Sequence, residues 1–111
     1  MNTRYRSAFR PGLFAGQVIV VTGGGSGIGR CTAHELASLG AHVVLVGRKL
    51  EKLQTVAEEI VVDGGYASFH AADIRDEAAV QALVTAIVVT HGRIHCLVNN
   101  AGGQYISPLE K

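Results

Sequence analysis

The sequence predicts an α/β domain organised around a parallel sheet. From residue 17 onward, short β-branched runs alternate with longer amphipathic stretches, which is the pattern of repeated βαβ units. Three of the four short runs are continuously apolar, as expected for parallel strands that are covered on both faces. The first run is followed by five glycines within seven residues, at the start of a helical pattern. This combination favours an open α/β sheet with an anion site at one edge.

The expected strands and helices alternate along the chain. Strands are expected at residues 18–21, 43–46, 67–72 and 94–98, the third being weak enough to form a sheet edge. Helices are expected at residues 28–39, 50–62 and 77–91, each followed by a glycine or glycines that stop it. Right-handed crossovers then predict the strand order 3-2-1-4, the N-terminal half of a doubly wound, Rossmann-like parallel sheet. Residues 1–15 are expected to form an extended arm, and residues 16–111 an incomplete domain.

Two of the expected helices carry apolar stripes that predict their buried faces. The stripe of the second helix comprises Leu50, Leu53, Ala57, Ile60 and Val61. The stripe of the third comprises Val80, Leu83, Val84, Ile87 and Val88. The two cysteines are predicted to be small core residues, Cys31 and Cys96. The acidic face of the second helix is expected to be solvated, with Glu51, Glu58 and Glu59.

Composition excludes several classes of protein. The 111-residue chain is 48% apolar and 17% charged with a net charge of +1, which argues against disorder and against a nucleic-acid surface. Its apolar runs are far shorter than the roughly 20 residues that span a bilayer, so no membrane partner is expected. The histidines show no metal-ligand spacing. Two cysteines without a disulfide pattern favour a reducing compartment, the cytoplasm, with the peroxisome or mitochondrial matrix as alternatives.

The glycine-rich turn is predicted to cradle a phosphate. Its expected binding residues are Thr22, Gly23, Gly25, Ser26, Gly27, Ile28 and Gly29. Backbone N–H groups at a helix start, with no side chains in the way, favour an anion such as a pyrophosphate. The alternative of a P-loop is disfavoured, because Arg30 and Cys31 stand where a lysine and a hydroxyl residue would hold a triphosphate and magnesium. A tight turn without a ligand is the other alternative.

The end of the second strand carries a second determinant. A dinucleotide site has an acid there for the ribose hydroxyls, or an arginine for a 2′-phosphate. Here Gly47 takes the place of the acid, and Arg48 and Lys49 follow it. Two merely solvated basic residues are the alternative, which is weakened because cations at a helix start oppose the helix dipole. The sequence therefore favours NADP over NAD as the cofactor.

Three motifs in register resemble the short-chain dehydrogenase/reductase family. They are Thr22-Gly23-x-x-x-Gly27-Ile28-Gly29, Asp73-Ile74 after the third strand, and Asn99-Asn100-Ala101-Gly102 after the fourth. The resemblance covers residues 13–111. It implies that Asp73 and the backbone of Ile74 meet the adenine of the cofactor. It also implies that Asn99, Ala101 and Gly102 line the ribose side.

A finer resemblance points to one branch of this family. Residues 10–14, 47–50 and above all 102–108 are similar to the peroxisomal trans-2-enoyl-CoA reductases and their bacterial relatives, with the dienoyl-CoA reductases as close neighbours. These enzymes reduce a carbon-carbon double bond of an acyl-CoA with NADPH. The resemblance thus implies NADPH as a partner and an acyl-CoA-like small molecule as the substrate of the full-length protein, which we expect to be a homo-oligomer.

The catalytic residues that the resemblance implies are not found in this sequence. The resemblance implies chemistry that depends on an asparagine, a serine and a Tyr-x-x-x-Lys pair, in which the lysine lowers the pKa of the tyrosine. Asn99 and Asn100 belong to the cofactor motif and are not expected to be the catalytic asparagine. None of the three tyrosines, Tyr5, Tyr66 and Tyr105, has a lysine four residues later. The chain is therefore expected to be inactive by itself, as the cofactor-binding half of a longer protein, a truncated product or a fragment. The competing hypothesis is a non-catalytic NADP-binding module.

Overall fold

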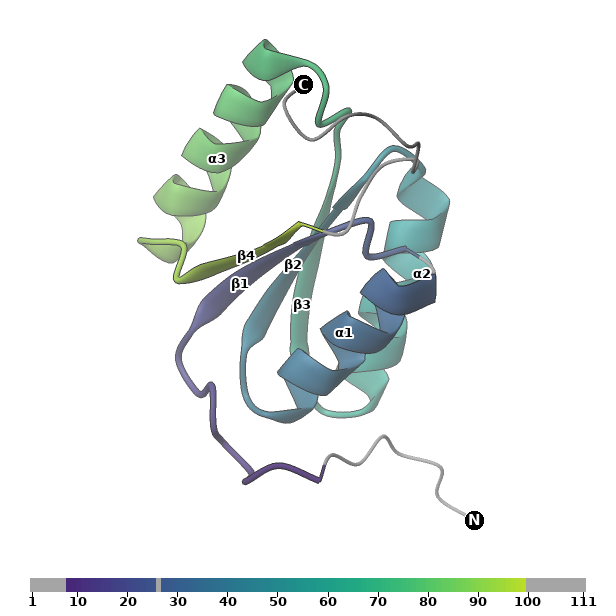
Figure 1. Ribbon diagram of the computed structural model, residues 1–111, viewed down its shortest axis with the longest axis vertical. Helices are drawn as coiled ribbons and strands as arrows, with labels where there is room; N and C mark the ends of the chain where they lie inside the picture. The colour runs from purple at the N-terminus through teal and green to yellow at the C-terminus, as the bar shows by residue number, and fades with distance from the viewer. Residues whose placement is uncertain (1–7, 26, 100–111) are drawn as a thin grey trace, which may run out of the picture.

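The computed structural model describes residues 8–25 and 27–99, which form a four-stranded parallel sheet between two helical layers (Figure 1). The strands are β1 (Val18–Thr22), β2 (His42–Gly47), β3 (Tyr66–Ala71) and β4 (Cys96–Asn99). The helices are α1 (Gly27–Ser38), α2 (Leu50–Val62) and α3 (Glu77–His91). Helices α1 and α2 cover one face of the sheet and α3 covers the other. Among the described residues, no helix is both long and apolar enough to cross a membrane.

The strand order is β3-β2-β1-β4, and every pairing is parallel. The register aligns Val20 with Val44 of β2 and with Leu97 of β4. The weakly apolar β3 forms a sheet edge, as its composition predicted. The predicted Rossmann-like fold class and its strand order are confirmed. The register places the carboxyl ends of all four strands at one edge of the sheet.

Alternate residues of the two central strands supply two separate cores. Toward α1 and α2 point Ile19, Val21, Val43 and Leu45. Toward α3 point Val18, Val20, Val44 and Val46. Because both faces of β1 and β2 are covered, these strands are apolar at nearly every position, which is the physical basis of the continuous runs in the sequence.

The buried face of α2 differs from the predicted stripe. Its buried residues are Leu53, Val56, Ala57 and Ile60, whereas Leu50 is 49% and Val61 is 56% exposed. Leu50 is the first residue of the helix, and Val61 lies about 100° around the axis from Ile60. The predicted stripe is therefore wrong for Leu50 and Val61, and it omits the buried Val56.

The apolar stripe of α3 is only partly buried. Ile87 is fully buried, but Val84 and Val88 are 43% and 40% exposed. An apolar hollow of about 290 Å³ lies between α3, β1 and β4 and leaves part of the helix face uncovered. The prediction of five inward residues was thus wrong for Val84 and Val88. Val84 lines this hollow, which no described segment fills.

Both cysteines are exposed, so their prediction as core residues was wrong. On α1 the sheet is contacted by Gly29, Ala33 and Ala37, which places Cys31 on another side of the helix. Cys96 lies on β4, whose neighbour among the described strands is β1 alone. Helical period and strand position, rather than the burial habit of cysteine, decide the two environments.

The described part of the N-terminal arm is folded against the domain. Residues 11–16 form turns instead of the extended segment expected from the sequence. The N–H of Phe14 donates to the carbonyl oxygen of Leu39 at 2.8 Å, and the Phe14 side chain packs against the core under α1 and α2. Gly40 has a φ of 97°, and a Cβ there would lie 3.0 Å from the Cα of Ala15. Glycine at position 40 therefore both ends α1 and admits the arm.

Two histidines meet at the amino edge of the sheet, and they predict a pH dependence of stability. The rings of His42 and His91 lie 4.3 Å apart. Burial lowers the pKa of His42, and the charge of His91 lowers it further. The unfolded chain then binds the proton first as the pH falls. Stability present at about pH 8 should be lost as the pH falls through about 6.5, the ordinary pKa of histidine.

Thermal melts between about pH 8 and pH 5 measure this effect. We expect His42→Gln to reduce the fall in melting temperature on acidification. The control is His70→Gln on the neighbouring strand, which leaves the contact between His42 and His91 in place and retains the pH dependence of the parent chain. An unchanged pH dependence in His42→Gln would contradict the assignment.

Candidate cofactor-binding site

The carboxyl edge of the sheet brings together the segments that follow all four strands. The N–H of Gly23, after β1, donates to the carbonyl oxygen of Val46 at 2.7 Å. The N–H of Ala72, after β3, donates to the carbonyl oxygen of Gly47 at the end of β2, also at 2.7 Å. Ligands of open α/β sheets bind at this edge. The structure therefore places the predicted site segments side by side.

The glycines of the turn between β1 and α1 serve two different purposes. Gly23 and Gly27 have φ values of 69° and 59°, which favour glycine and let the chain turn into the helix. Gly24 and Gly25 are required by packing instead. A Cβ at Gly24 would lie 2.7 Å from Cδ2 of Leu45, and one at Gly25 would lie 3.0 Å from Cβ of Lys52. The glycines at positions 24 and 25 therefore have a packing role that is separate from any contact of their N–H groups with a phosphate.

The start of α1 lies at the carboxyl edge. The helix begins at Gly27, Ile28 is 74% exposed, and Gly29 is buried against the sheet. Its first N–H groups have no partner within the helix and carry the positive end of the helix dipole, so they suit an anion. Ser26, which the sequence also assigned to this site, lies outside the described residues.

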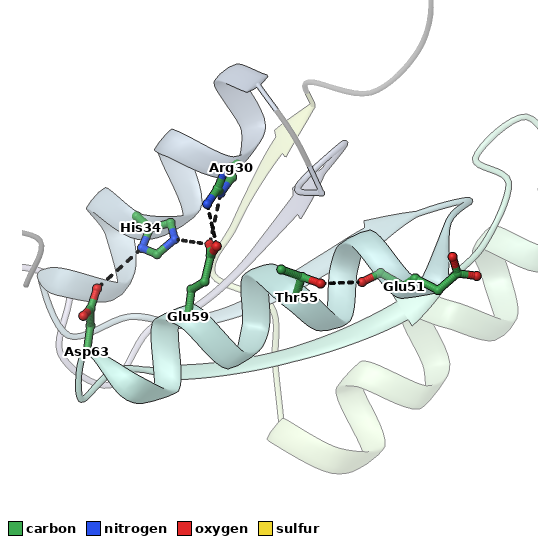
Figure 2. Close-up of polar contacts among 6 residues, drawn as sticks. All are labelled: Arg30, His34, Glu51, Thr55, Glu59 and Asp63. Atoms are coloured by element: carbon green, nitrogen blue, oxygen red, sulfur yellow. Dashed lines mark hydrogen bonds and ion pairs between the residues drawn. The ribbon is translucent and has the colours of Figure 1, made fainter.

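Arg30 is bonded into an interhelical cluster between α1 and α2 (Figure 2). Its Nε donates to Oε1 of Glu59 at 3.0 Å, and its Nη2 donates to Oε2 of the same carboxylate. His34 contacts Glu59 Oε1 through Nε2 at 3.0 Å and lies 3.9 Å from Asp63 through Nδ1. The hydrogen bond from Arg30 lowers the pKa of Glu59. The expectation that Glu59 is merely solvated was wrong, because it joins α1 to α2.

Arg48 and Lys49 are both exposed at the end of β2. Lys49 is the N-cap residue of α2 and makes no side-chain capping hydrogen bond. A Cβ at Gly47 would lie 3.2 Å from Cδ2 of Leu53, so the absence of an acid at this position also suits the packing of α2. Arg48 takes part in none of the ion pairs between described residues, and its charge contributes to the electrostatics of Asp73.

Asp73 is held by a residue that the sequence analysis did not assign to the site. Arg75 donates from Nε to Oδ1 and from Nη2 to Oδ2 of Asp73, both at 3.1 Å, and from its backbone N–H to Oδ1 at 3.0 Å. These bonds, with a smaller contribution from Arg48, lower the pKa of Asp73 to about 2. The Asp-x-Arg spacing was the available signal. The side chain of Ile74, between the two, packs against the core under α3.

Asn99 meets the end of β1. The Thr22 hydroxyl lies 3.2 Å from Oδ1 of Asn99 and 3.3 Å from the carbonyl oxygen of Val98. Ala101 and Gly102, the other predicted residues on the ribose side, lie outside the described residues. Within the described ranges, no cluster of histidine, cysteine or acidic residues could hold a metal ion. The edge therefore offers a helix start, exposed cations, an oriented carboxylate and an amide.

These features agree with the family to which the sequence can be matched. A family model described as short chain dehydrogenase matches residues 17–111. The chain therefore belongs to the short-chain dehydrogenase family, an oxidoreductase family that uses nicotinamide cofactors.

Two solved structures are similar to this chain in both sequence and fold. The citronellol catabolism dehydrogenase AtuB of Pseudomonas aeruginosa PAO1 is 69% identical with a TM-score of 0.87, over 96% of this chain and 43% of that chain. A metagenomic short-chain oxidoreductase in complex with NADP is 49% identical with a TM-score of 0.80, over 87% of this chain and 44% of that chain.

A curated relative bears on the branch within the family. A probable 2,4-dienoyl-CoA reductase of Bacillus subtilis (strain 168) is 36% identical over 95 residues, which is 86% of this chain and 37% of the relative. The resemblance to the enoyl-CoA and dienoyl-CoA reductase branch is confirmed at this level. The chain spans only a little over a third of this relative's length and less than half of the two solved structures.

Proposed function

We propose that this chain binds NADP(H) at the carboxyl edge of its sheet, as the cofactor-binding part of an oxidoreductase. The observation that carries the proposal is the pair of exposed cations, Arg48 and Lys49, after a strand that ends in Gly47 where an NAD site would have an acid. The similarity to a short-chain oxidoreductase in complex with NADP supports it.

Each segment of the edge has a role in this proposal. The helix start at residues 23–29 holds the pyrophosphate, and Arg48 with Lys49 holds the 2′-phosphate. Asp73 and the backbone of Ile74 meet the adenine. Asn99, with Ala101 and Gly102, lines the ribose. The donors and acceptors fit these groups, since N–H groups and cations face the phosphates while the carboxylate can accept from the adenine amine.

The reaction proposed for the full-length protein is reduction of a carbon-carbon double bond in an acyl-CoA-like substrate. NADPH would supply the hydride when bound, and a serine and a Tyr-x-x-x-Lys pair outside this sequence would hold and move the proton. The names of curated relatives such as the probable 2,4-dienoyl-CoA reductase support this substrate class. The full-length protein is proposed to act as a homo-oligomer. The proposed compartment is a reducing one, the cytoplasm, with the peroxisome or mitochondrial matrix as alternatives, since both cysteines are free.

A second candidate reaction comes from the 69% identical structure. That protein is described as a citronellol catabolism dehydrogenase, so oxidation of a branched, acyclic terpenoid alcohol by the full-length protein is the alternative. The two candidates share the cofactor edge and differ in the substrate and in the direction of hydride transfer. A non-catalytic NADP-binding module is the third candidate, favoured by the absence of a Tyr-x-x-x-Lys pair from the sequence.

Fluorescence titration of the purified chain with NADPH and NADH tests the cofactor assignment. We expect NADPH to bind at least about tenfold more tightly, because only NADPH carries the phosphate that Arg48 can pair with. The chain by itself should not oxidise NADPH in the presence of an enoyl-CoA. It should also not oxidise citronellol in the presence of NADP. Equal affinity for both cofactors would contradict the NADP assignment, and turnover by the chain itself would contradict the proposal that the catalytic residues lie elsewhere.

A further inference from the structure

Arg75 donates three hydrogen bonds to the carboxylate of Asp73. Its guanidinium donates to both carboxylate oxygens at 3.1 Å, and its backbone N–H adds a third bond to Oδ1 at 3.0 Å. The backbone bond closes a local turn around the carboxylate, and the two side-chain bonds define its plane. The contacts from Arg75 thus favour one orientation of the Asp73 side chain.

The geometry leaves Asp73 able to receive a further donor. Each carboxylate oxygen can accept two hydrogen bonds. Oδ2 accepts one bond from Arg75, while Oδ1 accepts two. The side chain of Asp73 is 40% exposed at the carboxyl edge. Oδ2 of Asp73 can therefore accept one further hydrogen bond in addition to the described bond from Arg75.

We infer that Arg75 is a positioning residue, which orients the Asp73 carboxylate so that Oδ2 accepts a hydrogen bond from the exocyclic amine of the cofactor's adenine. This inference rests on the proposed function. Arg75 does not touch the cofactor in this arrangement. Its contribution is to limit the rotation of the Asp73 side chain, which would otherwise have to be ordered when the cofactor binds.

A cofactor analogue can separate this role from a general effect on stability. Nicotinamide hypoxanthine dinucleotide phosphate carries a carbonyl oxygen in place of the adenine amine, so its exocyclic group presents an acceptor to Asp73 instead of a donor. The parent chain should bind NADPH about tenfold more tightly than the reduced analogue, since a hydrogen bond to a charged acceptor is lost. In Arg75→Gln this ratio should fall to about threefold or less, while the preference for NADPH over NADH stays unchanged.

Three further variants serve as controls. Arg75→Lys keeps the charge but loses the two-pronged contact, so it should behave like Arg75→Gln. Asp73→Asn supplies an amide that can accept or donate, and it should bind NADPH and the analogue about equally. Arg93→Gln removes an exposed arginine before β4, at the opposite edge of the sheet, and should leave the ratio at the parent value.

The outcomes distinguish the inference from the function on which it rests. If Arg75→Gln weakens NADPH and the analogue equally, Arg75 is only structural and the inference is overturned. If the parent chain prefers NADPH over NADH but does not distinguish adenine from hypoxanthine, the inference fails while the proposed function stands. If the parent chain binds neither cofactor, the proposed function itself fails. Melting temperatures of all variants confirm that each is folded.

Discussion

Replacing Arg48 by alanine should weaken NADPH binding about tenfold to a hundredfold and leave NADH binding nearly unchanged. A charge-assisted hydrogen bond contributes about 1.5 to 3 kcal/mol, and each 1.4 kcal/mol is a factor of ten in affinity. Arg48 is exposed and belongs to none of the ion pairs between described residues, so its removal should not disturb the fold. Parallel titrations of the parent chain and of Arg48→Ala with NADPH and NADH measure the effect.

Two comparisons sharpen the result for Arg48. Arg48→Lys retains the charge without the planar guanidinium and should lose less NADPH affinity than Arg48→Ala. Arg30→Ala removes a nearby arginine that is bonded to Glu59, and should leave the preference for NADPH intact. Equal losses of NADPH and NADH affinity in Arg48→Ala would show that Arg48 does not contact the 2′-phosphate.

Substitutions at Leu45 and Gly24, which pack against each other, should produce the largest changes in the free energy of unfolding. Leu45 is fully buried, and Leu45→Ala should cost about 2 to 5 kcal/mol of unfolding free energy through the cavity that it leaves. Gly24→Ala should cost about 1 to 3 kcal/mol, because the new Cβ overpacks the core. That Cβ would lie 2.7 Å from Cδ2 of Leu45. Urea denaturation of each variant measures these costs.

The double variant tests whether the two positions share one packing site. Leu45→Ala removes the atom against which the new Cβ would clash, so the double variant should be less destabilised than the sum of the single changes, by about 0.5 to 3 kcal/mol. The control pairs Gly24→Ala with Val44→Ala, since Val44 points into the core on the other face of the sheet. These two changes should be additive, and equal non-additivity in both cycles would contradict the local contact.

Much of the fold could be predicted from the sequence because its signals are local. The alternation of β-branched runs with helical stretches located every strand and helix to within about two residues, which is the usual uncertainty of an element's end. The handedness of βαβ crossovers then restricted the strand order to the one observed. The approximate position of the cofactor edge follows from parallel pairing, which places the ends of all strands together.

The errors concern the direction in which side chains point. Cys31, Leu50 and Val84 belong to apolar patterns but are exposed, since burial depends on which side of a helix meets the sheet and on whether a segment covers it. Glu59 was assigned to solvent but pairs with Arg30, 29 residues earlier in the chain. Contacts between residues so far apart cannot be deduced from helical period alone.

Residue order alone was enough to predict the class of fold, the sheet edge proposed to bind a cofactor and the residue types available there, because strand runs, glycine stops and strand-end residues are properties of short segments. The contacts that hold those residues in place are seen only in the folded structure. A Cβ at Gly24 or Gly25 would crowd a neighbouring side chain, Arg30 is bonded to Glu59, and Arg75 is bonded to Asp73. These roles depend on distances between atoms of separate segments or on the local path of a turn, which residue order leaves open.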